Sequence, residues 1–364
     1  MATKKIAYYI GSLNRGGAET LLVDIFNHTD LLPYEVVCIY RNDGNLTNLF
    51  CQTGVRMIKL PRKRSWLLYV VRFRRLLKKE KVDIVHSQTS LNAIIAVLST
   101  RFTKINVVNT FHGFDFAQAN RALRKLVFKG CRRLIFVSRF ERQFYLERGD
   151  FGVSDKCDVV YNGISFVKFA PLDRHSCFNN PLKMCMVGSF GSGRNHLFVC
   201  HFLDLLKERG IDYKFYFIGA ARESERNVYD DCYNYCKEHN LLDRVEFKGL
   251  CNNVPQQLSM MDAFVYSTRH DSFGISVIEA IASGLPTFVN DWGVMKEITN
   301  DGEYAVLYPS EDLDALFERF NSFLANRTEY ERLAQKSAMA VRERYSIEAH
   351  ISQLSSIYAQ ILHK

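Results

Sequence analysis

A glycine-rich segment that carries one arginine has the composition of a diphosphate-binding loop. Residues 188–196 read Gly-Ser-Phe-Gly-Ser-Gly-Arg-Asn-His and lie between a predicted strand, Lys183–Val187, and a predicted helix. Glycines let backbone N–H groups approach an anion closely, and the positive end of the helix and the guanidinium of Arg194 attract the same charge. A merely flexible connector would not need a basic residue at the helix start. The predicted contacts are Gly188, Ser189, Arg194 and Asn195.

Two carboxylates eight positions apart, Asp271 and Glu279, form the second candidate feature. A predicted strand, Ala263–Tyr266, leads into the loop that holds Asp271, and Glu279 falls in a helix predicted from about Ile275 to Ser283. Asp271 can accept hydrogen bonds from sugar hydroxyls there, and Glu279 from a ribose diol. An accidental surface pair is disfavoured by the apolar neighbours of Glu279, since a charge embedded there needs partners. Backbone amides that could also meet phosphate belong to Phe273, Gly274 and Ile275.

Two weaker signals lie in the first half of the chain. Gly16 and Gly17 stand at a predicted strand-to-helix turn, where a P-loop would need Lys and Ser or Thr after its second glycine, and the G-x-G-x-x-G spacing is absent. His112 follows a strand predicted at Ile105–Asn109 and precedes Gly113, so it could hydrogen-bond a polar ligand at the strand end. A simple tight turn and a structural histidine are the competing interpretations.

The elements that must position these residues alternate between short apolar strands and helices along most of the chain. Such alternation predicts two parallel sheets, each covered by helices on both faces, with ligands bound beyond the carboxyl ends of the strands. The first set of predicted strands is Lys5–Ile10, Glu35–Tyr40, Val55–Leu60, Val82–His86, Ile105–Asn109, Leu134–Val137 and Asp158–Val160. The second set is Lys183–Val187, Lys214–Ile218, Val245–Lys248, Ala263–Tyr266 and Thr287–Val289.

The pattern breaks once, and it becomes purely helical after Ser310. We therefore expect a first domain at 1–168, a linker at 169–181 and a second domain at 182–345, because the linker region contains prolines and shows no period. The last segment, 346–364, is predicted to be a helix that returns to the first domain.

The order of these motifs resembles that of the retaining GT-B glycosyltransferases of family four, which bacterial capsule and lipopolysaccharide sugar transferases typify. The resemblance covers nearly the whole chain, and its most specific part is the segment 271–286. It implies two Rossmann-like domains facing across a cleft, acceptor binding in the first domain and nucleotide-sugar binding in the second. It also implies transfer with retained anomeric configuration and no obligatory metal. The other matching segments are 16–19, 112–113, 137–138, 162–164 and 188–195.

The resemblance also implies a role for each candidate residue. Glu279 would bind the ribose, Asp271 the donor sugar, and Arg194 the departing diphosphate. His112 would contact the transferred sugar near the reacting centre, while Gly16 and Gly17 would line the cleft near donor phosphate or acceptor. Three positions depart from the family pattern: Ser189 where an arginine is common, Arg194 where a lysine is common, and Asp271 where the family has glutamate.

The net charge of +9 is concentrated in two stretches of the first domain. Residues 61–81 contain nine basic side chains and one acid, and residues 121–133 contain six basic side chains and no acid. The sequences 62–81 and 121–133 fit helices with an apolar stripe and basic flanks, which would suit peripheral contact with an anionic membrane. A core helix with a solvated basic face fits equally well. No nucleic-acid-binding motif accompanies the charge, so we expect no nucleic-acid partner.

The remaining composition indicates a cytoplasmic globular protein, and the two basic stretches are the reason to expect it at the inner face of the plasma membrane. No apolar run approaches the roughly 20 residues that span a bilayer, and no signal peptide is apparent. Ten scattered cysteines show no metal-ligand spacing. From the resemblance we expect a UDP- or GDP-sugar co-substrate, no required metal and no other cofactor. The expected acceptor is a glycan or a polyprenyl-diphosphate-linked sugar. Two alternatives stay open: a sugar-nucleotide epimerase of the same fold, and a noncatalytic nucleotide-sugar-binding partner of a transferase complex.

Overall fold

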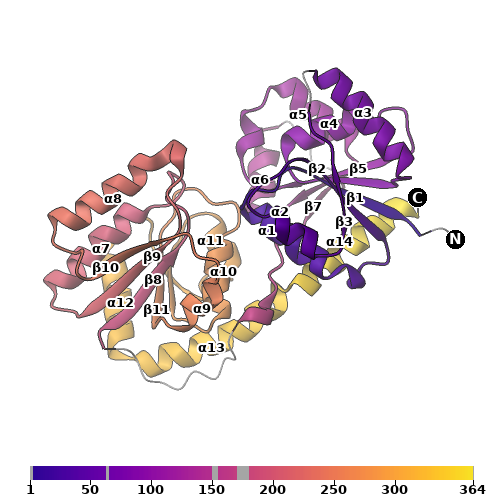
Figure 1. Cartoon of the computed structure of the whole chain (residues 1–364). Helices are drawn as coiled ribbons and strands as arrows, with labels where there is room; N and C mark the ends of the chain where they lie inside the picture. Colours follow the sequence, from indigo (N-terminus) through magenta and orange to yellow (C-terminus); the bar gives the residue numbers. More distant parts are fainter. Residues whose placement is uncertain (1–2, 63–64, 150–154, 170–179, 364) are drawn as a thin grey trace. The chain divides into compact units, whose positions relative to one another are not determined.

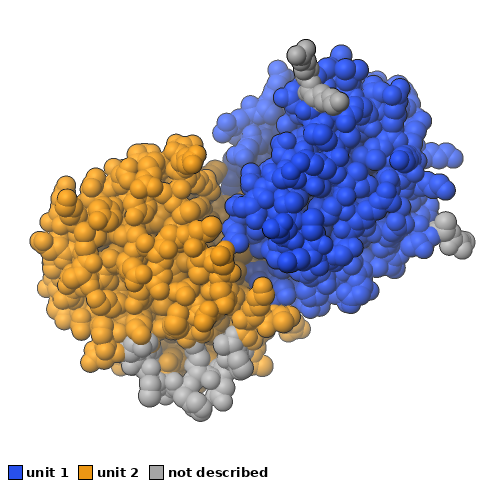
Figure 2. Space-filling model, in the orientation of Figure 1, with its two compact units in different colours: residues 1–165, 345–364 blue, residues 166–344 orange. Residues whose placement is uncertain are grey.

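The computed structural model describes residues 3–62, 65–149, 155–169 and 180–363, which form two compact units (Figures 1 and 2). Unit 1 contains residues 1–165 and 345–364, and unit 2 contains residues 166–344. The predicted linker, 169–181, falls largely on residues 170–179, which lie outside the described residues.

Unit 1 is built on a seven-stranded parallel sheet in the order β3-β2-β1-β4-β5-β6-β7. Its strands are β1 (Lys5–Ser12), β2 (Glu35–Asn42), β3 (Arg56–Lys59), β4 (Ile84–Ser87), β5 (Asn106–Phe111), β6 (Arg133–Phe136) and β7 (Cys157–Val159). The central strand β1 is apolar on both faces because both faces are covered. Ile6, Tyr8 and Ile10 enter one hydrophobic core, and Ala7 and Tyr9 enter the other.

Helices cover both faces of the unit 1 sheet (Figure 1). The first core takes side chains from α1 (Gly17–Asn27), α2 (Thr47–Gln52) and α14 (Ile347–Leu362). The second takes side chains from α3 (Trp66–Lys79), α4 (Ser90–Thr100), α5 (Arg121–Gly130) and α6 (Arg139–Glu147). Short 3₁₀ turns lie at Thr29–Leu31 and Asp115–Gln118.

The C-terminal helix α14 joins unit 1 through a backbone contact with the end of the first segment. The N–H of Ile164 donates to the carbonyl of Tyr345 at 2.9 Å, and the N–H of Ile347 donates to the carbonyl of Ile164 at 3.1 Å. Gly163 permits this approach, since a Cβ at that position would lie 2.9 Å from the Cα of Ile347. The side chain of Ser346 caps α14 by accepting from the N–H of Ala349.

Unit 2 contains a six-stranded parallel sheet in the order β10-β9-β8-β11-β12-β13. Its strands are β8 (Leu182–Val187), β9 (Tyr213–Ile218), β10 (Val245–Gly249), β11 (Ala263–Tyr266), β12 (Thr287–Asn290) and β13 (Val306–Tyr308). Its helices are α7 (His196–Glu208), α8 (Arg226–Glu238), α9 (Val254–Ser259), α10 (Ile275–Ala282), α11 (Val294–Ile298), α12 (Leu313–Ala325) and α13 (Arg327–Arg344). Further 3₁₀ turns lie at Phe166–Lys168 and Glu223–Glu225. Helix α7 packs against α8 and against α12, and α10 packs on α13.

The predicted fold class is confirmed in its two parallel sheets and its helical C-terminus. Each predicted strand overlaps an observed one. The bounds of most strands differ by one or two residues. In particular, β5 extends to Phe111, so that His112 rather than Thr110 is the first residue beyond it, and the three-residue strand β13 was not predicted.

Candidate functional site

The glycine-rich segment 188–195 leaves the carboxyl end of β8 and packs closely around Arg194. The N–H of Gly188 continues the sheet ladder by donating to the carbonyl of Ile218 at 2.9 Å. A Cβ at Gly188 would lie 2.5 Å from Nε and 2.7 Å from Cδ of Arg194. The glycine at 188 therefore lets the arginine side chain lie directly on the backbone of the loop.

The two segments that the sequence singled out are hydrogen-bonded to each other. The carbonyl of Gly193 accepts from the backbone N–H groups of Arg269 at 3.0 Å and His270 at 2.9 Å. The Thr268 hydroxyl donates to the same oxygen at 2.8 Å, and the N–H of Asn195 donates to the carbonyl of Ser267 at 3.0 Å. This pairing fixes the glycine-rich loop against the loop that follows β11.

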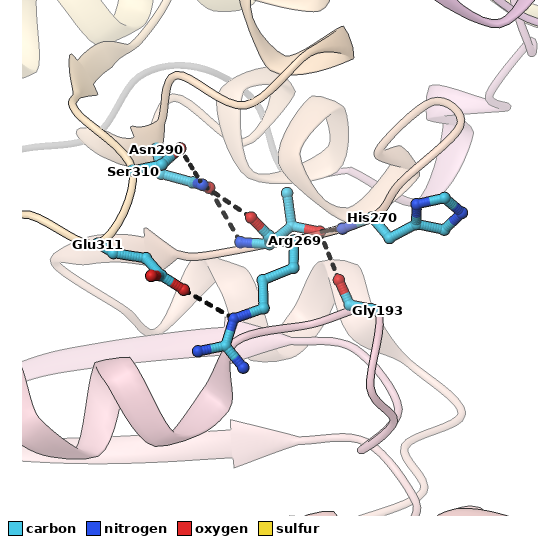
Figure 3. Close-up of polar contacts among 7 residues, drawn as sticks. Gly193, Arg269, His270, Asn290, Ser310 and Glu311 are labelled. Atoms are coloured by element: carbon cyan, nitrogen blue, oxygen red, sulfur yellow. Dashed lines mark hydrogen bonds and ion pairs between the residues drawn. The ribbon is translucent and has the colours of Figure 1, made fainter. Parts of the chain in front are cut away.

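A buried asparagine holds the second loop in turn. Asn290, the last residue of β12, accepts from the N–H of Thr268 at 2.9 Å and donates from Nδ2 to the Thr268 carbonyl at 2.8 Å. Its Nδ2 also donates to the Ser310 hydroxyl at 2.9 Å (Figure 3). The guanidinium of Arg269 pairs with Glu311 at 2.8 Å, so this arginine has a carboxylate partner of its own.

Arg194, Tyr266 and Asp271 form the polar centre of the paired loops. The Tyr266 hydroxyl donates to Oδ2 of Asp271 at 2.9 Å, and the N–H of Phe273 donates to Oδ1 at 3.2 Å. The electrostatic effects of Tyr266 and then of Asp271 raise the pKa of Arg194, although burial opposes them. Burial raises the pKa of Tyr266 above its ordinary range, so at neutral pH this hydroxyl is a neutral donor. Asp271 is thus the negative group that Arg194 faces.

The guanidinium of Arg194 retains unused hydrogen-bonding capacity. Its Nε is buried and, among the described residues, has no hydrogen-bond partner. Because an unsatisfied buried donor costs about 1–3 kcal/mol, an oxygen of a bound anion is a fitting partner for it.

A second cation lies next to the loop, beside Ser189, the residue that stands where an arginine is common in the family. Nε of Arg222, which follows β9, donates to the Ser189 hydroxyl at 3.3 Å. Glu225 holds this region together: its Oε1 accepts from the N–H of Ser192 at 2.9 Å, and its Oε2 pairs with Arg222 at 3.3 Å. The hydrogen bonds from Ser192 lower the pKa of Glu225. Gly188 and Ser189, which are consecutive, therefore each contact a different arginine.

Helix α10 begins at a glycine that no other residue could replace without strain. Gly274 caps the helix at φ +92°, and a Cβ there would lie 2.9 Å from side-chain carbons of both Ile298 and Met295. Ile275 is the first helical residue, and Glu279 lies one turn further along, half-buried. The free N–H groups of the first turn make this helix end favourable for an anion.

The candidate residues of unit 1 form a separate set. Gly16 caps α1, and a Cβ there would lie 2.5 Å from a carboxylate oxygen of Glu19. His112 makes a 2.9 Å hydrogen bond between its Nε2 and Oε1 of Gln88. Burial and, secondarily, His350 lower the pKa of His112 to about 3, so its imidazole is neutral at neutral pH. A neutral imidazole can donate or accept a hydrogen bond without adding charge.

The structure thus joins most, but not all, of the predicted residues. Gly188, Ser189, Arg194, Asn195, Asp271 and Phe273 belong to one continuous hydrogen-bonded or packed group, and Gly274, Ile275 and Glu279 follow directly on α10. Gly16, Gly17 and His112 belong to unit 1, and the contacts above do not connect them to this group. The sequence prediction missed Tyr266, Thr268, Asn290, Arg222 and Glu225.

Two other kinds of feature are absent from the described residues. Within the described ranges, no cluster of three or more histidine, cysteine or acidic side chains could hold a metal ion. No helix in the same ranges combines the length and apolarity that crossing a bilayer requires.

Comparison with known proteins places these loops in a family. Residues 15–166 match the family described as Glycosyltransferase Family 4, and residues 173–339 match Glycosyl transferases group 1. The chain belongs to these glycosyltransferases. The family predicted from the motif order is thereby confirmed.

Individual relatives of this glycosyltransferase include two from Escherichia coli. One is a UDP-Gal:alpha-D-GlcNAc-diphosphoundecaprenol alpha-1,3-galactosyltransferase, 27% identical over 72% of this chain and 73% of its own length. The other is the O-antigen biosynthesis glycosyltransferase WclY, 21% identical over 97% of this chain and 98% of its own.

Among solved structures, a glycosyltransferase from Rickettsia africae has a TM-score of 0.86 at 18% identity, covering 100% of this chain and 99% of its own. The Anabaena protein Alr3699/HepE in complex with UDP has a TM-score of 0.84 at 15% identity, covering 98% of this chain and 100% of its own. At these identities the likeness shows the fold, and it confirms the GT-B architecture.

Proposed function

We propose that this glycosyltransferase moves a sugar from a UDP- or GDP-sugar to a glycan or lipid-linked acceptor, with retained anomeric configuration and without a metal. The observation that carries the proposal is the pairing of the glycine-rich loop with the loop after β11, which brings Arg194 and Asp271 together at the carboxyl edge of the sheet. Two relatives are described as a galactosyltransferase that uses UDP-Gal and as an O-antigen glycosyltransferase, which supports a role in surface polysaccharide synthesis.

The difficult step of such a transfer is departure of the nucleoside diphosphate from a sugar that develops oxocarbenium character. Positive groups fixed in advance at the leaving oxygens lower this barrier. In our proposal Arg194 offers its unpartnered Nε to one phosphate, Arg222 adds a second positive charge beside Ser189, and the first turn of α10 offers backbone N–H groups.

The remaining donor contacts follow from the positions of the two acids. Asp271, oriented by Tyr266, would accept from hydroxyls of the donor sugar, and Glu279 would accept from the ribose. His112, neutral at working pH, would hydrogen-bond the transferred sugar. We infer no protein nucleophile for a double displacement, so the acceptor hydroxyl would attack from the face that the diphosphate leaves, transferring its proton to a departing phosphate oxygen.

The basic stretches of unit 1 support peripheral contact with the inner face of the plasma membrane. On α3, Tyr69, Phe73 and Leu77 are buried in the core, whereas Leu67 and Leu68 are 80% and 65% exposed. Exposed leucines beside basic side chains can enter the surface of an anionic bilayer. Lys63 and Arg64, which belong to the predicted stretch 62–81, lie outside the described residues.

The decisive experiment follows nucleoside diphosphate release with and without acceptor, after a thermal-shift screen has selected the donor. A ligand that binds the folded state raises stability according to its concentration and affinity. We expect a UDP- or GDP-sugar to raise Tm and the release of nucleoside diphosphate to require the acceptor. We also expect NMR to show that the product linkage keeps the donor's anomeric configuration. Release without any acceptor dependence would favour an epimerase, and donor binding without any turnover would favour a noncatalytic partner.

A further inference from the structure

Two arginines share one exposed indole ring at the carboxyl edge of the unit 1 sheet. Arg41 lies near the end of β2, Arg62 follows β3, and Trp66 begins α3. The Cζ atom of Arg62 lies 4.7 Å from the centroid of the Trp66 ring, and that of Arg41 lies 5.9 Å from it. We call this group the Arg41–Arg62–Trp66 cluster.

Neither guanidinium in the cluster has a carboxylate within ion-pair distance among the described residues. Arg41 is half-buried, and neutral groups hold it: the Tyr9 hydroxyl accepts from Nη1 at 2.9 Å, and the amide oxygen of Asn92 accepts from the same nitrogen. Asp43, two residues further along the chain, pairs with Lys59 instead. Burial raises the pKa of Tyr9, so its hydroxyl supplies no negative charge at neutral pH.

This arrangement is unfavourable without a ligand. A partly buried charge with no counter-ion loses hydration, and two like charges beside one ring repel each other. The faces of Trp66 and Tyr9 compensate only in part, because an aromatic ring attracts a cation but carries no net charge to neutralise it. An anion bound at the cluster would supply the missing counter-charge and reduce both penalties.

Apolar surface borders the same cluster. Leu67, Leu68 and Val71 follow Trp66 on α3 and are exposed, and Leu91 is exposed beside Asn92 on α4, the helix that packs against α3. Single exposed leucines are ordinary, but several together next to an indole mark a surface for an apolar ligand. A ligand that satisfies the whole region carries negative charge at one end and hydrocarbon at the other.

We propose that the Arg41–Arg62–Trp66 cluster binds the diphosphate of a lipid-linked acceptor, with the hydrocarbon chain lying along Leu67 and Leu68. The acceptor assignment rests on the proposed function, whereas binding of an isoprenoid diphosphate does not depend on turnover. The cluster would fix the lipid end of the acceptor, leaving its sugar free to reach the reacting centre.

The test uses the full-length chain with farnesyl diphosphate as the probe. The chain has two tryptophans, so Trp292→Phe leaves Trp66 as the single reporter of the cluster. We expect farnesyl diphosphate to change Trp66 emission saturably, while farnesol and inorganic diphosphate bind roughly tenfold or more weakly, since each offers one half of the interaction. Arg62→Ala should weaken farnesyl diphosphate binding about tenfold, the effect of losing one charge-assisted contact.

Arg75→Ala is the matched control, because Arg75 is an exposed basic residue on α3, the helix that Trp66 begins, and its loss lowers the net charge equally. We expect it to leave farnesyl diphosphate binding unchanged. The proposal would be overturned if both substitutions weakened farnesyl diphosphate binding equally. It would also be overturned if the chain bound anionic phosphatidylglycerol vesicles as tightly as farnesyl diphosphate. Either result would indicate a nonspecific membrane surface. Arg41→Lys keeps the positive charge but loses the planar guanidinium with its paired N–H donors. It should weaken the binding of farnesyl diphosphate without lowering Tm by more than a few degrees.

Binding of farnesyl diphosphate tests the cluster, and binding of a nucleotide-sugar donor tests the proposed function, so the two can fail separately. Thermal shifts with UDP- and GDP-sugars report on unit 2 and should be the same for the Arg62→Ala and parent chains. Donor binding without farnesyl diphosphate binding would refute the cluster alone. Farnesyl diphosphate binding without donor binding would refute the proposed function alone.

Discussion

Replacing Arg194 with alanine should slow transfer far more than it destabilises the fold. A preorganised positive group at developing charge contributes roughly 3–4 kcal/mol to the transition state, so kcat should fall about 10²–10³-fold. The expected loss in the free energy of unfolding is smaller, about 1–2 kcal/mol, because Asp271 keeps its hydrogen bonds from Tyr266 and Phe273. The unpartnered Nε means that the substitution strands no protein acceptor at that atom.

The assay compares kcat and donor KM for acceptor-dependent diphosphate release with the urea midpoint of the same variant. Arg226→Ala is the control: this arginine begins α8 in the same unit, but its side chain is 61% exposed and pairs with Asp230 on that helix. It should transfer at close to the parent rate. Arg194→Lys should recover part of the lost kcat, since it restores charge without the guanidinium geometry. Wild-type kcat in Arg194→Ala would refute the diphosphate assignment, and a loss of stability as large as the loss of rate would show a structural role instead.

Three further outcomes are expected. EDTA should leave the initial rate unchanged, and a complete loss that Mg²⁺ or Mn²⁺ restores would contradict the metal-free mechanism. Gly274→Ala should lower the free energy of unfolding by about 1–3 kcal/mol in urea titrations, because position 274 has φ +92° and its Cβ would press on Ile298 and Met295; unchanged stability would contradict the close packing. Burial holds the pKa of His86 and of His196 at about 3, so the unfolded chain gains protons below about pH 6.5 that the folded chain does not. The free energy of unfolding should therefore fall as the pH drops from about 6.5 toward 4, by up to ~1.4 kcal/mol per pH unit for each histidine, and a flat profile would contradict their neutral burial.

Local patterns predicted the strands and the loops that follow them because parallel strands buried on both faces are nearly continuous apolar runs. The bounds of β11, Ala263–Tyr266, were predicted correctly, and the strand before the glycine-rich loop was one residue short. The strand β13 was missed because three residues are too few to show a period. The end of β5 was placed two residues early because Thr110 and Phe111 resemble the start of a loop next to His112 and Gly113.

Residues that act through neighbours distant in sequence could not be predicted in this way. Arg222 lies beside Ser189 because the segment after β9 continues to pair with the segment after β8: the N–H of Phe190 donates to the carbonyl of Ala220 at 3.0 Å. No local sequence pattern near Arg222 predicts that pairing. Tyr266 has the appearance of an ordinary strand residue, and only its 2.9 Å bond to Asp271 identifies it as part of the site.

The position of Arg222 changes how the unusual Ser189 is best interpreted. Taken alone, a serine at 189 suggests weaker binding of the diphosphate, since one arginine would face its whole charge. In the folded chain the serine hydroxyl accepts from Arg222, while Gly188 supports Arg194. The two cations thus come from different segments and meet at consecutive residues of one loop. Because Glu225 ties Arg222 to Ser192, the second charge is held by contacts to the loop itself, so loop geometry and positive charge should be lost or kept together.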